Sequence, residues 1–165
     1  AKGRALMRRV LSAVLAGLCS SVAAEPLADM QGAWSGSGWA RETPEGPKET
    51  VRCRMENTYE SNVLTVSGRC VAAGQKLALA GEIKGKAASE QITGHWFNPD
   101  GLGFVRISGV RRGAVIAFTF AAIHPETGVD IAQNVEWRVG EQGLRLRASD
   151  RTDPRITMSD IAFTR

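Results

Sequence analysis

Few residues of this chain carry reactive or metal-binding groups: the 165 residues include two histidines, three cysteines and one tyrosine. His95 and His124 follow neither H-x-H nor H-x-x-x-H spacing, which disfavours a zinc site and predicts that both are surface residues. The sequence has no G-x-S-x-G motif and no C-x-x-C pair, and its acidic residues are scattered. We therefore expect no catalytic residue, no metal and no cofactor, and a protein that is not an enzyme.

Apolar runs long enough to span a membrane are missing beyond the first 24 residues. Within that leader, Arg8-Arg9 precede an apolar stretch at residues 10–18, and small residues up to Ala24 follow before Glu25. This order is typical of a secretory signal peptide, and the apolar stretch is too short to span a bilayer. We expect cleavage after Ala24, or after Ala23, which leaves residues 25–165 as a single periplasmic or secreted domain without a transmembrane segment.

A surplus of charge of one sign is also missing once the leader is set aside. The whole chain has a net charge of +4, but four of its 21 Lys and Arg residues lie in 1–24, and all 17 Asp and Glu residues lie beyond it. Residues 25–165 therefore carry equal numbers of positive and negative side chains. The basic surplus that is typical of nucleic-acid-binding proteins is absent, so we expect no nucleic-acid partner.

Helical periodicity is absent from residues 25–165, where short runs of alternating apolar and polar residues recur between turn sequences. The pattern predicts strands at residues 32–41, 49–58, 63–71, 76–84, 90–97, 103–111, 114–122, 130–139, 143–150 and 156–164. Such a meander favours an all-β fold, a closed antiparallel up-and-down barrel of eight to ten strands, with a sandwich as the alternative. Charged outward positions such as Arg145 and Arg147 disfavour a membrane-embedded barrel.

Cys53 and Cys70 flank a hairpin pattern whose two-residue turn is expected at Ser61-Asn62. That turn places the two cysteines directly opposite each other on neighbouring strands, within bridging distance. We therefore predict a structural disulfide, which fits an oxidising compartment. A redox-active pair is the alternative, and the spacing disfavours it. The third cysteine, Cys19, lies in the leader, where the bulk of Leu18 disfavours a lipid anchor.

A weak repeat of the form apolar-small-Gly runs through the middle of the chain. It ends at Gly68, Gly81, Gly94 and Gly109, and each glycine has the parity of the apolar face of its strand. Glycines on the inner face of a barrel either bend the strands or leave room for a ligand. The bending interpretation needs no ligand and is favoured.

Three tryptophans, Trp34, Trp96 and Trp137, also have apolar-face parity, whereas Trp39 lies on the opposite face of its strand. Inward tryptophans either form the barrel core, which is the favoured interpretation, or line a pocket for an apolar or aromatic ligand. In the second case the candidate ligand site consists of these three tryptophans together with Gly81, Gly94 and Gly109.

The sequence Gly32-Ala33-Trp34 on the first predicted strand resembles the calycin group, which includes lipocalins, avidins and bacterial metalloprotease inhibitors. The resemblance implies a lipocalin-like barrel in which Trp34 closes one end. It also implies two functions: a non-enzymatic protein that holds a small hydrophobic or aromatic molecule inside the barrel, or a periplasmic protease inhibitor that presents Glu25–Gln31 to an enzyme. An envelope-associated interaction protein that binds a periplasmic protein is the third possibility.

The leader generates a first prediction. N-terminal sequencing of the protein purified from its native host should find Glu25 or Ala24 as the first residue, because the signal peptide is removed during export. Cytosolic material with an intact amino terminus would contradict export.

Overall fold

The computed structural model describes residues 25–98, 103–123 and 125–165, which form ten strands and one short helix, α1 (Pro26–Asp29). The strands are β1 (Gly32–Ala40), β2 (Glu49–Glu60), β3 (Val63–Ala72), β4 (Gln75–Gly85), β5 (Gln91–Asn98), β6 (Gly103–Arg112), β7 (Val115–Ile123), β8 (Asp130–Val139), β9 (Gly143–Asp150) and β10 (Thr157–Thr164). Each pairs antiparallel with its sequence neighbours, and β1 pairs with β10. The predicted closed antiparallel barrel is confirmed, and the sandwich is not formed.

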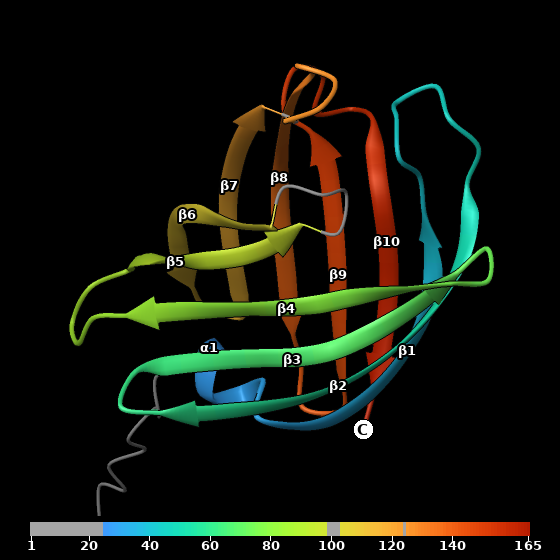
Figure 1. Ribbon diagram of the computed structural model, residues 1–165. Coiled ribbons are helices and arrows are strands. Elements are labelled where there is room, and N and C mark those ends of the chain that lie inside the picture. Colours follow the sequence, from blue (N-terminus) through green and yellow to red (C-terminus); the bar gives the residue numbers. More distant parts are fainter. Residues whose placement is uncertain (1–24, 99–102, 124) are drawn as a thin grey trace, which may run out of the picture.

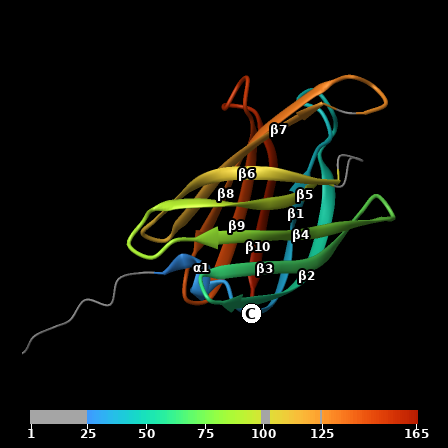
Figure 2. The ribbon, with the colours of Figure 1, turned by 60° about the vertical axis from the view of Figure 1, so that its left-hand side comes forward.

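The strands of the barrel fall into two groups that cross each other. Figure 1 shows β2 to β6 running across the front, while β7 to β10 run upright behind them, and Figure 2 shows the same crossing from the side. Sheets that cross in this way turn sharply where one group passes into the other. No helix in the described residues is long and apolar enough to cross a membrane.

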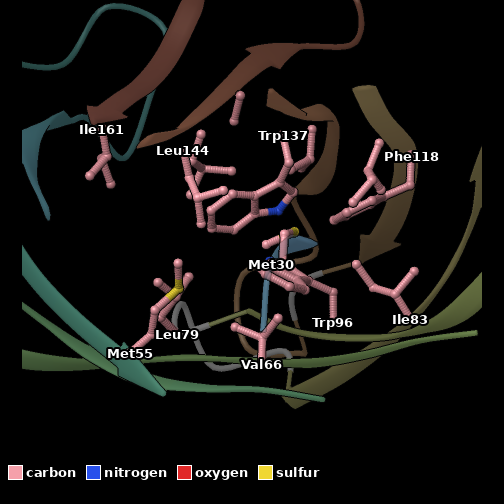
Figure 3. Packing of buried hydrophobic residues seen from close by; sticks show 14 of the residues in the cluster. Met30, Met55, Val66, Leu79, Ile83, Trp96, Phe118, Trp137, Leu144 and Ile161 are labelled. Carbon is pink, nitrogen blue, oxygen red and sulfur yellow. The ribbon is translucent and has the colours of Figure 1, made fainter. Parts of the chain in front are cut away.

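Alternate residues of every strand point into one continuous core, as the alternating sequence pattern requires. Figure 3 shows Trp137 at the centre of this core, with Trp96 below it and Phe118 beside it. Leu64, Ile83, Ile116 and other aliphatic side chains surround the aromatic rings and are also buried. Burial of apolar side chains on all ten strands is the main source of stability.

The hairpin of β2 and β3 has the register that the cysteine spacing predicts. Ser61 and Asn62 form its turn, both with positive φ (50° and 65°), as a two-residue hairpin turn of this kind requires. Cys53 lies opposite Cys70 in the ladder, and the two form a disulfide. The predicted disulfide is confirmed, and it indicates folding in an oxidising environment.

Helix α1 closes one end of the barrel. Leu27 and Met30 are 0% exposed, so the segment is packed into the barrel rather than standing free. The Met30 carbonyl accepts hydrogen bonds from Trp34 Nε1 and Asn57 Nδ2, both at 3.0 Å. Because buried polar groups need such partners, these bonds fix the segment beneath the core. Figure 1 shows α1 at the lower end of the upright strands.

The disulfide generates a second prediction. Replacing Cys53 and Cys70 together by alanine should lower the free energy of unfolding by about 3 kcal/mol, because the cross-link restricts the unfolded chain. Urea unfolding followed by tryptophan fluorescence measures the loss, and the reduced wild-type protein is the matched control. Titration of the native protein should find no free thiol among residues 25–165. Two reactive thiols in material from an oxidising compartment would contradict the prediction.

Candidate functional site

The three inward tryptophans are all buried in the core, and two of them, Trp96 and Trp137, pack against each other. Trp34, Trp96 and Trp137 are 2%, 7% and 0% exposed. The ring centroids of Trp96 and Trp137 are 6.2 Å apart, and Trp96 also contacts Phe118 at 5.4 Å. These are ordinary distances for packed aromatic pairs. Trp39 faces outward, where Lys48 Nζ lies 4.0 Å from its ring centroid.

Three buried side-chain polar atoms have no hydrogen-bond partner within the described ranges. One, Arg111 Nη1, forms an ion pair with Glu25, and the other two lie in the interior. They are Trp137 Nε1 and Asn57 Oδ1. Leaving a buried polar group unpaired costs roughly 1–3 kcal/mol. An acceptor brought next to Trp137, or a donor brought next to Asn57, would therefore be bound favourably.

The three candidate glycines lie where other atoms come very close to the chain. A β-carbon at Gly81 would overlap the Trp96 ring, one at Gly94 would overlap the Glu82 carbonyl oxygen, and one at Gly109 would overlap the Ala117 carbonyl oxygen. Glycine permits this approach because it has no β-carbon. The contacts are those that the bending interpretation requires. A ligand-binding role for the three glycines stays a prediction.

An interior cavity of about 150 Å³ lies at the end of the barrel away from α1. Its apolar lining includes Leu79, Trp96, Phe120 and Met158, and Arg41 and Gln133 contribute polar groups. Phe120 is near the end of β7 and Met158 near the start of β10, which places the cavity at the upper end of the upright strands in Figure 1. Of the six candidate ligand residues, Trp96 alone lines this cavity.

The outer wall carries two larger hollows that the sequence analysis did not predict. One, of about 620 Å³, crosses β6 to β10 and is lined by apolar residues and by Ser, Thr and Asn residues such as Thr119 and Asn134. Its two charged residues, Glu136 and Arg147, have opposite signs, so it is called the uncharged hollow below. The other, of about 1180 Å³, crosses β10, β1, β2 and β3, and is called the basic groove below because Arg52, Arg54, Arg69 and Arg165 line it.

Glycines with inward parity underlie both hollows. Gly109 lines the uncharged hollow, and Gly36 and Gly68 line the basic groove. A β-carbon at Gly36 would overlap the Phe163 ring, and one at Gly68 would overlap Met55. With no side chain between the wall and these core residues, the wall lies closer to the core. The inward parity of Gly68 and Gly109 was predicted from the sequence, whereas their position beneath hollows of the outer wall was not.

Elsewhere on the surface, several cations are paired with carboxylates. Asp160 lies between Arg145 (2.8 Å) and Arg147 (3.6 Å), and the hydrogen bonds from Arg145 hold the pKa of Asp160 below its ordinary value. Hydrogen bonds from Arg112 likewise lower the pKa of Glu90. Exposed pairs of this kind contribute little to stability. Seven Lys and Arg residues form such pairs in the described ranges, and others, such as Arg106, form none.

The histidines do not form a site in the part of the chain that the structure describes. His95 points outward and is exposed, as its parity predicts, and His124 lies outside the described residues. No group of three or more His, Cys, Asp or Glu residues that could hold a metal ion occurs within those ranges.

No model of a protein family matches the chain, and no curated protein matches it in sequence. Its function is therefore inferred from the barrel, the cavity and the outer hollows.

The close approach at Gly94 generates a third prediction. Gly94→Ala should lower the free energy of unfolding by roughly 1–3 kcal/mol, because its β-carbon would press on the Glu82 backbone of the next strand. Gly140→Ala is the matched control, since the nearest atom to a β-carbon there is the Gly143 carbonyl oxygen at 3.3 Å. Equal unfolding midpoints in urea for Gly94→Ala and the wild type would contradict the prediction, because they would show that the Glu82 backbone leaves room for a β-carbon at residue 94.

Proposed function

We propose that this protein is an exported, non-enzymatic binding protein of lipocalin-like design, which takes a small hydrophobic or aromatic molecule at one end of its barrel. The observation that carries the proposal is the difference between the two ends. Helix α1 fills one end with Leu27 and Met30, whereas the other has a cavity lined by apolar and aromatic side chains. Sites for small ligands are typically concave, largely apolar and equipped with a few polar groups.

The size of the cavity limits the ligand. Sites for drug-sized molecules measure about 300–1,000 Å³, and this cavity measures about 150 Å³. A cavity of roughly this size in another protein holds one benzene ring. The ligand is therefore a single-ring molecule, or a longer one that inserts one ring or a short apolar end.

Polar groups near the cavity favour an aromatic molecule that carries a hydrogen-bond acceptor. Trp96 lines the cavity and packs against Trp137, whose buried N–H has no partner within the described ranges. An acceptor that reached past Trp96 would satisfy this N–H. A phenol-like molecule combines the apolar ring with such an oxygen.

The inhibitor alternative is less well supported. It expects Glu25–Gln31 to be presented to a protease, but Leu27 and Met30 of this stretch are fully buried. Glu25 is also held in place, since its carboxylate lies 2.8 Å from Arg111 Nη1. Presenting the stretch would require unplugging the barrel, so the cap is better understood as part of the fold.

Ligand binding is the fourth prediction. In calorimetric titrations with phenol, 4-cresol and toluene, at least one should bind the wild-type protein, and Trp96→Phe should weaken that binding by about tenfold through loss of ring contact area. Trp39→Phe is the matched control because Trp39 lies on the outer wall. This variant should bind the same probe with the affinity of the wild type.

Native mass spectrometry of protein from its own host gives an independent measurement, in which a small molecule should accompany the folded chain. If none of the three probes binds and no molecule is carried through purification, the proposal is wrong. An equal loss of affinity in Trp39→Phe and Trp96→Phe would place the site elsewhere.

A further inference from the structure

We propose that the basic groove binds an extended, acidic segment of a partner protein. The groove lies on the outer wall, across β10, β1, β2 and β3, and has a volume of about 1180 Å³. This proposal does not depend on a ligand inside the barrel, because the arginine side chains of the groove point outward.

The floor of the groove is formed by small side chains. The outward positions of β1 and β10 carry Ala33, Ser35, Ser37 and Ala162, and β3 adds Ser67, while β2 between β1 and β3 carries the arginines. Short side chains on a wall that Gly36 and Gly68 bring close to the core leave space for the backbone of another chain. The serine hydroxyls supply hydrogen-bonding groups along this floor.

The arginines of the groove are not balanced by the protein itself. Arg52, Arg54 and Arg69 are exposed, and none has an ion pair or side-chain hydrogen bond within the described ranges. Arg54 stands directly opposite Arg69 in the ladder. Like charges in this position are destabilising. Glu56 is the one carboxylate in the groove's lining, so a net positive charge remains.

Arg165 adds a positioned cation at one edge of the groove. Its guanidinium lies 4.0 Å from the Trp34 ring centroid, and it donates hydrogen bonds to the carbonyls of Gln31 (3.0 Å) and Asp29 (3.2 Å). These contacts restrict the side chain before any partner arrives. Less conformational entropy is then lost on binding.

The spacing of the charges fits an extended chain. Arg52 and Arg54 are two residues apart on β2, so their side chains leave the same face about 6.5 Å apart along the strand. In an extended partner segment, alternate side chains have this same spacing. Glutamate or aspartate at every second position would therefore meet successive arginines, and guanidinium groups bind carboxylates through paired hydrogen bonds.

The shape of the site favours a peptide over a membrane or strand pairing. Strands β1, β2 and β3 of the groove each have a paired neighbour on both sides, which leaves little free edge there to which a partner strand could add. The hollow beside these arginines has room for a short extended segment, which can contact its Ser and Ala residues as well, whereas a flat lipid surface would meet only the projecting guanidinium groups. A narrow acidic segment can enter the groove and be held by side chains alone.

Peptide binding is the fifth prediction. A fluorescein-labelled peptide of alternating glutamate and serine should bind the full chain. Increasing the salt concentration should weaken this binding, because salt screens exposed charges. The same peptide with glutamine in place of glutamate should not bind. The double variant Arg54→Gln/Arg69→Gln should weaken binding at least about tenfold.

Arg106→Gln is the matched control, since Arg106 is an exposed strand arginine without an ion pair in the described residues and lies outside the groove. It should bind the peptide as the wild type does. The double variant should unfold in urea at the same concentration as the wild type or a higher one, because it removes a like-charge pair. A lower midpoint would instead assign the two arginines a structural role.

Three results would overturn the proposal. They are no binding of the acidic peptide at low salt, equal weakening by Arg106→Gln and by the double variant, and tight binding to phosphatidylglycerol vesicles when the peptide does not bind. Phosphatidylcholine vesicles are the reference for the last of these. That last result would assign the arginines to an anionic membrane surface.

Discussion

Pairing of β1 with β10 is the constraint on which the rest of the structure depends. Residues 35–40 pair antiparallel with residues 159–164, and this single ladder converts a ten-strand meander into a closed sheet. Closure gives every strand of the described sheet two neighbours, although β4 and β5, and β6 and β7, pair along only part of their lengths. It also requires the strands to tilt and coil strongly around the axis. The inward glycines lie where neighbouring atoms come closest.

Core side chains and neighbouring backbone occupy the space beside those glycines. In an evenly round barrel, small inward residues would enlarge the interior. Here the Trp96 ring covers Gly81, the Phe163 ring covers Gly36, and neighbouring backbone lies over Gly94 and Gly109. The interior retains a small cavity at one end, and the larger hollows lie on the outer wall. The same residue type therefore accounts for a well-filled core and a grooved exterior.

The elements were predictable because they depend on local patterns. All ten strands were expected within two residues of their observed bounds, since alternation and turn residues are read along the chain. The disulfide was predictable because the Ser61-Asn62 turn determines the register of β2 and β3. The inward orientation of the three tryptophans followed from parity alone. Each of these inferences concerns one strand or one hairpin.

What could not be predicted depends on atoms that are distant in sequence. Leu27 and Met30 are buried because α1 packs against β3 and β7 at one end of the barrel, and these strands are distant from α1 in the sequence. The basic groove needs β10 beside β1, a pairing that no local motif encodes. The Arg54–Arg69 pair follows from the hairpin register, but its lack of carboxylate partners depends on where the other strands place their acidic residues. The pattern of a single sequence does not show which distant residues come into contact.

The order in which the chain can fold follows from how far apart its paired residues lie. Cys53 and Cys70 are 17 residues apart, so the β2–β3 hairpin closes a short loop and can form before the rest of the chain is complete. The β1–β10 ladder joins residues from opposite ends of the described chain and must wait for the last strand. The arginine-bearing side of the basic groove can therefore form early, and the side made by β1 and β10 forms last. A nascent or truncated chain carries the charges without the hollow, and only the finished barrel presents both.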